Sequence, residues 1–184
     1  MEIRRRFHFR EGSLTETTEY AAPSRLEALR ALPWRNAILA GIGATITIAI
    51  LAGAADLTAL PLIIAPFGAS CALVFGAPAS PLAQPRNVVG GHLVTATLGL
   101  LAFTSIASPV AAMAVGVGLG IAGMLLTGTL HPPAGANPIV VVLAAASWQF
   151  LLMPVAVGAV SIVLIGYIYH RIVTGHAYNV LPKR

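Results

Sequence analysis

Residues 131–138 read HPPAGANP, and they interrupt one of the most apolar parts of the chain. The runs on either side, residues 109–128 and 139–147, are dominated by aliphatic side chains, alanine and glycine. Proline ends a helix or starts a new one, because it lacks a backbone N–H and clashes with the preceding turn. In hydrocarbon an unpaired backbone group costs several kcal/mol, so irregular backbone must be buried in protein or face water. The stretch therefore predicts a broken helix inside a membrane domain.

The composition supports a membrane location for the whole apolar region. Hydrophobic residues make up 57% of the chain, charged residues only 9%, and the mean hydropathy is +0.85. Between Asn36 and His170 the formal charges are Asp56 and Arg86. A soluble domain usually has about a quarter of its residues charged. We therefore expect an integral membrane protein rather than a soluble domain with an oversized core.

Four segments are long and apolar enough to cross a bilayer as helices, and two more are broken. The clear spans are residues 37–55, 88–107, 109–128 and 148–171. The first broken segment, residues 58–81, contains Pro61, Pro66 and Gly68. The second is HPPAGANP with residues 139–147, which are too short to cross unaided.

The ends of the chain are polar. We expect residues 1–35 to form a loose cytoplasmic arm with a short amphipathic helix, because Ser24 and Glu27 match a capping box. An ordinary capped helix without lipid contact is the alternative. Residues 36–171 form the transmembrane domain, and residues 172–184 form a cytoplasmic tail.

The distribution of lysine and arginine predicts the orientation, since cytoplasmic loops carry an excess of both. Seven arginines precede the first span. Six crossings then place Arg86, Arg171, Lys183 and Arg184 on the same side as these arginines, with both termini in the cytoplasm. If the two broken segments do not cross, four spans remain and Arg86 moves to the opposite side. We favour six crossings, in a bacterial inner (cell) membrane.

The two broken segments also match each other at an offset of 67 residues. The offset aligns Pro66, Gly68, Ala69 and Ser70 with Pro133, Gly135, Ala136 and Asn137, Gly91 with Gly158, and Gly99 with Gly166. A unit of three crossings inserts its second copy upside down, which is a plan common among secondary transporters. The predicted fold is an all-α membrane protein with six transmembrane segments in two inverted three-segment repeats, about 36–107 and 108–171. The second segment of each repeat is a half-helix. Since glycine and proline also occur in ordinary transmembrane helices, a purely structural role is the alternative.

A helix that starts inside the membrane presents free N–H groups and a positive dipole end, which favour an anion. The candidate substrate-binding residues at the two starts are small or polar: Gly68, Ala69 and Ser70, and Gly135, Ala136 and Asn137. No carboxylate lies within the spans to neutralise a cation. The pattern therefore favours a small monovalent anion.

Other polar residues near the breaks have two interpretations each. His92 lies inside a span and could serve function or bond a neighbouring helix. His131 could donate to an anion, carry a proton, or cap a helix end. Arg86 and Asn87 lie at the predicted cytoplasmic mouth, where Arg86 attracts anions or only anchors the topology.

The stretches PFGAS (66–70), FGAPASPLAQPRNVVGGH (75–92) and LHPPAGANP (130–138) together resemble the HPP family of integral membrane proteins. The resemblance covers roughly residues 33–171. Plastid and cyanobacterial members are associated with nitrite transport, so the resemblance implies nitrite as the substrate. Some members carry C-terminal CBS modules, and we expect no regulation of that kind here because the sequence up to Arg184 contains none.

The leading hypothesis is a transporter or channel for a small inorganic anion such as nitrite. The alternative is a membrane scaffold or interaction protein with no transported substrate. We expect no enzymatic activity, since no Ser/His pair, HExxH motif or paired carboxylates occur in the spans. We also expect no cofactor, no metal and no nucleic-acid partner, while a homo-oligomer is possible. Proton coupling through His92 or His131 is a further hypothesis.

Overall fold

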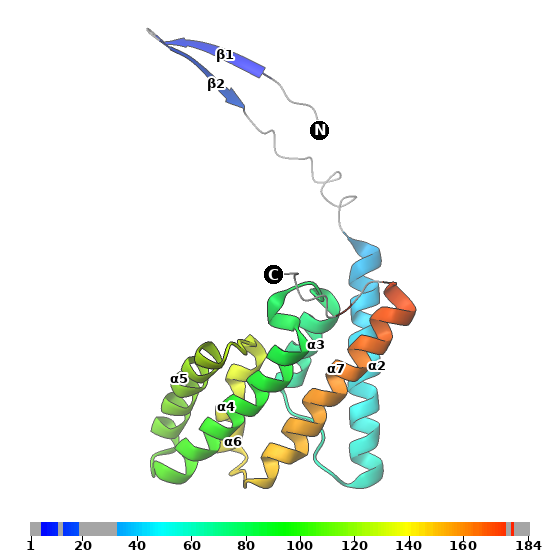
Figure 1. Ribbon diagram of the computed structural model, residues 1–184, viewed down its shortest axis with the longest axis vertical. Helices are drawn as coiled ribbons and strands as arrows, with labels where there is room; N and C mark the ends of the chain where they lie inside the picture. Colours follow the sequence, from blue (N-terminus) through cyan, green and yellow to red (C-terminus); the bar gives the residue numbers. More distant parts are fainter. Residues whose placement is uncertain (1–4, 11–12, 19–32, 176–177, 179–184) are drawn as a thin grey trace. The chain divides into compact units, whose positions relative to one another are not determined.

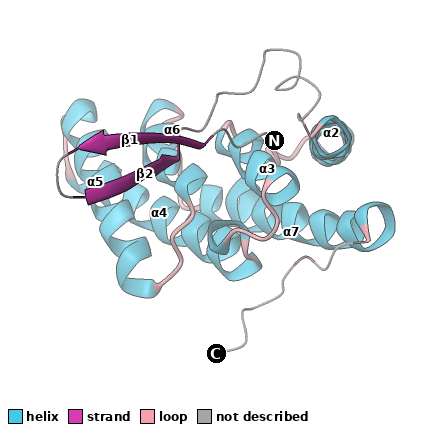
Figure 2. Ribbon diagram, turned by 90° about the horizontal axis from the view of Figure 1, so that it is seen from above, coloured by secondary structure: helices cyan, strands magenta, loops and turns pink. Residues whose placement is uncertain are grey.

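A computed structural model describes residues 5–10, 13–18, 33–175 and 178 (Figure 1). The chain divides into two compact units, Met1–Trp34 and Arg35–Arg184. In the first unit, strands β1 (Arg5–Arg10) and β2 (Ser13–Thr18) pair antiparallel, with Arg10 opposite Ser13 (Figure 2). Residues 33–175 contain helices and no strand.

The hairpin is an element that the sequence analysis did not predict within the N-terminal arm. Phe7, Phe9 and three threonines in residues 15–18 favour extended backbone, and only Glu11 and Gly12 separate the two strands. The absence of a clear period in this stretch obscured the pattern. The expected amphipathic helix near Ser24 falls in residues 19–32, which lie outside the described part of the chain. Residues 34 and 35 begin the first long helix.

Four long helices have the length and hydropathy to cross a membrane. They are α2 (Trp34–Thr58), α4 (Pro85–Ser105), α5 (Pro109–Thr127) and α7 (Val157–Tyr169), the last extended by the π-helical turns η3 (Leu151–Ala156) and η4 (His170–Thr174). These helices confirm the four clear spans. Exposed isoleucines on α2, such as Ile42 and Ile50, suit a lipid environment in which apolar side chains face outward.

Both predicted breaks are confirmed. The first gives the short helix α3 (Pro66–Gly76), followed by the 3₁₀ turn η1 (Pro81–Ala83). The second gives the 3₁₀ turn η2 (Pro132–Ala136) and the helix α6 (Asn137–Leu143). A proline stands in the first turn of each, where its missing N–H costs nothing and its fixed φ suits helical backbone.

Hydrogen bonds bring several helix ends together at one end of the helical unit. The Tyr169 hydroxyl donates to the Leu39 carbonyl, joining the end of α7 to the start of α2. His170 bonds the Val74 carbonyl near the end of α3, and Arg86 at the start of α4 donates to the Thr127 carbonyl at the end of α5.

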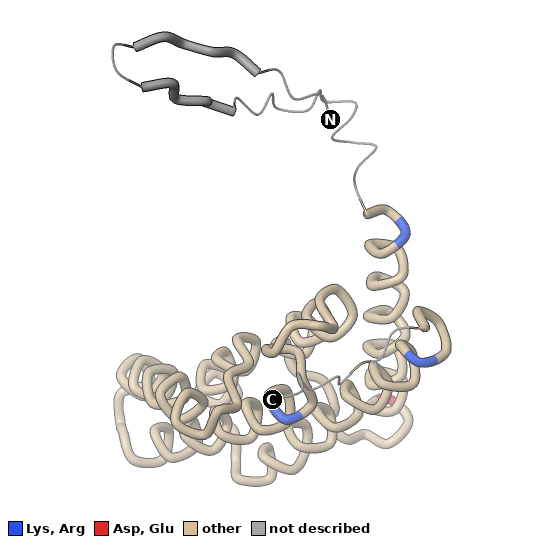
Figure 3. The backbone as a smooth tube through the Cα atoms, turned by 45° about the horizontal axis from the view of Figure 1, so that its top comes forward, with Lys and Arg blue, Asp and Glu red and all other residues tan. Residues whose placement is uncertain are grey.

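The formal charges within residues 33–175 are separated by sign between the two ends of the helical unit. Arg35 begins α2, Arg86 begins α4 and Arg171 follows α7, so all three arginines lie at helix ends that the bonds just described join. Figure 3 shows how few charged residues the described part of the chain carries. Asp56 lies near the opposite end of α2. Arg86 therefore shares an end with the other two arginines, as six crossings require.

The chain path through the two broken segments runs the length of the unit. Figure 1 shows residues 59–65 and α3 returning from the lower end of α2 towards its upper half. It also shows η2 and α6 descending from the upper end of α5 to the lower start of α7. Around them lies a core of buried residues that includes Phe67, Val74 and Ile162.

Glycines make reciprocal contacts between the two halves of the helical unit. A Cβ on Gly91 of α4 would lie 2.8 Å from the Thr129 carbonyl oxygen, just before the second break. A Cβ on Gly158 of α7 would lie 3.3 Å from the Leu62 carbonyl oxygen, just before the first break. Each long helix thus has a notch that admits the broken segment of the other half, and the two contacts are related by the offset of 67 residues.

Gly99 offers a test of this close packing, because a Cβ there would lie 2.7 Å from the Cα of Pro138. We expect Gly99→Val to destabilise the protein by about 1–3 kcal/mol through overpacking. Gly118→Val is the matched control, since nothing lies within 4 Å of a Cβ at that position. Thermal unfolding in detergent measures both. Equal melting temperatures for the two variants would contradict the packing described here.

Candidate functional site

Five polar side chains meet inside the helical unit, where α3, α4, η2 and α6 come together. Ser70, His92, Thr95, His131 and Asn137 are each 0% exposed, and we call them the polar cluster. Burying a polar group in an apolar environment is unfavourable unless the group finds a hydrogen-bond partner. The bonds within the cluster therefore determine whether it can exist at all.

Ser70 joins the two histidines. Its Oγ lies 2.8 Å from Nε2 of His92 and 2.9 Å from Nε2 of His131. The two imidazole rings are tilted, with centroids 5.2 Å apart. One hydroxyl from the first break thus bridges an imidazole from a long helix and an imidazole from the start of the second break.

Asn137 holds His92 from the other side. Its Nδ2 lies 3.0 Å from His92 Nδ1, from the His92 carbonyl oxygen and from Thr95 Oγ1. Thr95 in turn donates to the Gly91 carbonyl at 2.9 Å, so its oxygen is free to accept from the amide. The Asn137 amide therefore shares two protons among three acceptors and fixes the ring of His92.

The pattern of donors and acceptors assigns the tautomers when both histidines are neutral. Nδ1 of His131 lies 2.8 Å from the Leu82 carbonyl oxygen, which only accepts, so Nδ1 carries the proton and Nε2 accepts from Ser70. Because Ser70 has one proton to donate, His92 Nε2–H must donate to Ser70 Oγ, and His92 Nδ1 accepts from Asn137. The hydrogen bonds then run in one direction from Asn137 to Leu82.

Local sequence explains how His131 reaches this position. It has extended backbone, with φ −135° and ψ 99°, as is common for a residue that precedes proline. Gly91 allows the approach, since a Cβ there would lie 2.8 Å from the Cβ of His131. The backbone N–H of His131 points to the Met124 sulfur at 3.5 Å.

The structure brings together four of the predicted substrate-binding residues, namely Ser70, His92, His131 and Asn137. The others, Gly68, Ala69, Gly135 and Ala136, are exposed or half-buried and lie outside the set of fully buried polar side chains. The N–H of Gly68 donates to the Ala65 carbonyl at 3.2 Å, so this amide is already paired.

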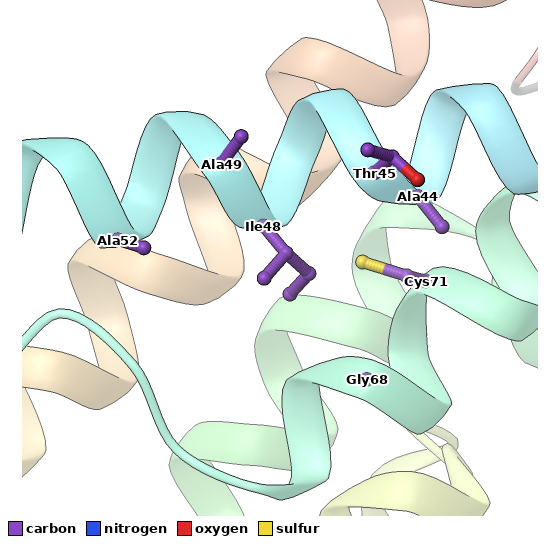
Figure 4. A pocket seen from close by; sticks show the side chains of 7 residues that line it. All are labelled: Ala44, Thr45, Ile48, Ala49, Ala52, Gly68 and Cys71. Carbon is purple, nitrogen blue, oxygen red and sulfur yellow. The ribbon is translucent and has the colours of Figure 1, made fainter.

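Gly68 instead lines an apolar groove between α2 and α3. The groove has a volume of about 480 Å³ (Figure 4). Its lining residues are Ala44, Thr45, Ile48, Ala49, Ala52, Gly68 and Cys71. Nothing lies within 4 Å of a Cβ added at Gly68 or at Gly135, so side chains at these positions would not strike the cluster directly.

Arg86 and Asn87, predicted at the cytoplasmic mouth, tie the start of α4 to the chain that leads into the second break. Nη2 of Arg86 donates to the Thr127 carbonyl at 2.9 Å, and Nδ2 of Asn87 donates to the Leu130 carbonyl at 2.9 Å. A cation at the C-terminus of α5 also stabilises the helix dipole. Arg86 is exposed. Its role in attracting anions stays a prediction.

Sequence reasoning missed Thr95 and the Leu82 carbonyl, which bond other groups of the site, and the buried Gln84 just before α4. Thr95 lies one turn after His92 on α4, and this helical spacing was a usable signal. The Leu82 carbonyl had no signal, because backbone acceptors are not visible in residue types. Gln84 is buried, and its Oε1 is the buried side-chain oxygen without a partner among the described residues. Within the same residues, no three His, Cys, Asp or Glu side chains gather to hold a metal ion.

Comparison with known proteins places this arrangement in a family. The chain is 41% identical over 123 residues to a transmembrane protein of Dictyostelium discoideum. The aligned stretch covers 62% of this chain and 39% of the relative. A second transmembrane protein of that organism is 34% identical over 128 residues, covering 65% of this chain and 45% of the relative. The chain thus spans less than half the length of these curated relatives. No solved structure matches it.

The family match covers most of the chain and confirms the resemblance seen in the three sequence blocks. A model of the HPP transmembrane region matches residues 29–179, which include the four long helices, both breaks and the whole polar cluster. The protein is therefore a membrane protein that belongs to the HPP family.

Proposed function

We propose that this protein transports a small inorganic anion, nitrite, across the membrane. The substrate would bind at the polar cluster, between the two broken segments. One observation carries the proposal: Ser70 and Asn137, which occupy equivalent positions in the two breaks, bond opposite nitrogens of the same buried imidazole, His92.

The chemistry of the cluster favours an anion. Its side chains offer imidazole N–H, amide N–H and hydroxyl donors, and none is a carboxylate. Asp56, the acidic residue of the helical unit, is exposed near the far end of α2. A buried cation would need compensating negative charge, whereas an anion needs donors. The choice of nitrite rests on the family resemblance alone.

Two inverted repeats with six crossings form part of the proposal. Shifting α3 by 67 residues gives 133–143, which coincides with η2 and α6, and shifting α4 gives 152–172, which coincides with η3, α7 and part of η4. The reciprocal notches at Gly91 and Gly158 support the same symmetry. Inverted repeats with paired broken helices are typical of transporters that bind their substrate near the middle of the membrane.

The proposed orientation has both termini in the cytoplasm, because Arg35, Arg86 and Arg171 lie at the end of the unit where α2 and α4 begin and α7 ends. A bacterial cell membrane stays a prediction, and the two relatives described above come from Dictyostelium discoideum.

A scaffold or interaction role is the second candidate, and one observation favours it. The side-chain polar atoms of the cluster all have partners within the protein, so the breaks are bonded to one another. A scaffold protein requires only such internal pairing and no open site for a substrate. A measurement of anion flux separates the two candidates. We propose no catalytic activity for either of them.

We expect reconstituted protein to take up nitrite into liposomes, and Ser70→Ala and Asn137→Ala to lower the uptake rate about tenfold or more. Ser70→Ala removes the partner of two buried imidazole nitrogens, and Asn137→Ala removes the Nδ2 partner of one. Each unpaired buried group costs about 1–3 kcal/mol. Uptake is measured per folded protein, with monodispersity checked by size-exclusion chromatography.

Ser147→Ala is the matched control, because Ser147 is exposed and lies outside the cluster. Protein-free liposomes correct for nitrous acid, which crosses lipid unaided. If well-folded Ser70→Ala and Asn137→Ala take up nitrite as fast as Ser147→Ala does, the cluster is not the binding site. If no anion in a panel crosses faster than in protein-free liposomes, the scaffold role is favoured.

Labelling of single cysteines tests the six crossings, using Ala79→Cys and Ala107→Cys in a Cys71→Ala background. Both alanines are exposed in links between helices. Six crossings put Ala79 in the cytoplasm and Ala107 outside, so a membrane-impermeant maleimide should label only the Ala107→Cys protein in intact cells. Four crossings with the same cytoplasmic termini predict the reverse pattern.

A further inference from the structure

The polar cluster contains two imidazoles that compete for one hydroxyl. In the neutral state the Ser70 O–H donates to His131 Nε2, and Ser70 Oγ accepts from His92 Nε2–H. The same hydroxyl has a second acceptor available, the Pro66 carbonyl oxygen at 3.2 Å, one turn earlier in α3. Ser70 can therefore turn its proton away from His131 without leaving it unpaired.

We propose that His131 takes up one proton with each anion, and that the rotating hydroxyl of Ser70 is the switch that couples the two. The inference rests on the proposed transport function and adds its energy source, which is the proton gradient. A proton from water binds Nε2 of His131, the Ser70 O–H turns to the Pro66 carbonyl, and the ring becomes an imidazolium. Release of the anion on the other side of the membrane returns the proton to water.

His131 rather than His92 is the group that accepts the proton, because of what surrounds each accepting nitrogen. At His131, a protonated Nε2 donates to Ser70 Oγ while Nδ1–H keeps its bond to the Leu82 carbonyl. At His92, a protonated Nδ1 would have the Asn137 amide nitrogen, which is itself a donor, at 3.0 Å, and the acceptor oxygen Oδ1 of the same amide only at 3.4 Å. Turning the amide over to bring Oδ1 closer would break its bonds to the His92 carbonyl and to Thr95.

Protonation also creates an arrangement that suits an anion. With His131 charged, the Nε2–H groups of both histidines point at Ser70 Oγ, at 2.8 Å and 2.9 Å. An anion oxygen that displaces the hydroxyl would accept from both donors at these distances, next to a positive charge. In the neutral cluster His131 Nε2 is an acceptor, so the same position repels an anion.

The other groups that contact His131 carry no formal charge. They are Ser70 from α3, His92 from α4, the Leu82 carbonyl from η1 and the Met124 sulfur from α5. His92 is the titratable member of this set, and it donates through Nε2 in both states. A proton on His131 is therefore balanced by the transported anion rather than by a protein carboxylate.

The test uses full-length protein in liposomes that contain a pH-sensitive dye, with nitrite as the probe at alkaline pH and protein-free liposomes subtracted. We expect an inward nitrite gradient to acidify the lumen, with one proton per nitrite and a rate that does not change with an imposed membrane potential. Uptake should fall about tenfold for each pH unit once His131 is largely unprotonated.

His131→Gln should lose both the proton movement and the dependence of uptake on pH. His170→Gln is the matched control, since His170 is buried and bonds the Val74 carbonyl outside the cluster, and it should keep both properties. A His131→Gln protein that retains the parent pH dependence overturns the assignment to His131. If this variant does not fold, the stoichiometry of the unmodified protein still decides the coupling.

The two proposals fail in different ways. Protein-dependent nitrite uptake that carries no proton, or that responds to membrane potential, overturns the coupling and leaves anion transport standing. Absence of protein-dependent nitrite movement in either direction, including nitrite exchange at equal pH, overturns the proposed function for nitrite and the inference with it.

Discussion

The helical unit depends on satisfying polar groups at the two places where its backbone is interrupted. Apolar surroundings provide no water to complete an unfinished turn, so each break must find partners inside the protein. His92 does this for both breaks at once, because its ring bonds Ser70 on one side and Asn137 on the other. The positions of α3, α4 and α6 follow from these bonds as much as from their apolar contacts.

The same interactions explain why the cluster is a candidate for function and not only for stability. Fully paired polar groups rigidify a core, but a hydroxyl with two possible acceptors gives it two arrangements of similar geometry. In the coupling that we propose, the turn of this one hydroxyl accompanies the change of charge at His131.

Much of this architecture could be predicted from sequence, and the limits have physical causes. Prolines and glycines identify both breaks because their backbone effects are local, and buried depth identified His92 and His131. The bridge through Ser70 could not be predicted, since Ser70 lies 22 and 61 residues from the two histidines in sequence. Residue type also does not tell which way a helix face points. Gly68 is close to Ser70 in sequence but lines a groove toward α2. The N-terminal hairpin was missed because a short pair of strands has a weak period.

The reciprocal notches have a consequence for biogenesis. Gly91 belongs to the first half of the helical unit and receives the chain at Thr129, while Gly158 belongs to the second half and receives the chain at Leu62. The packing around each notch therefore includes chain from the other half. Since a chain is synthesised from its N-terminus, the contact between Gly91 and Thr129 and the contact between Gly158 and Leu62 can both form only after the second half has been made.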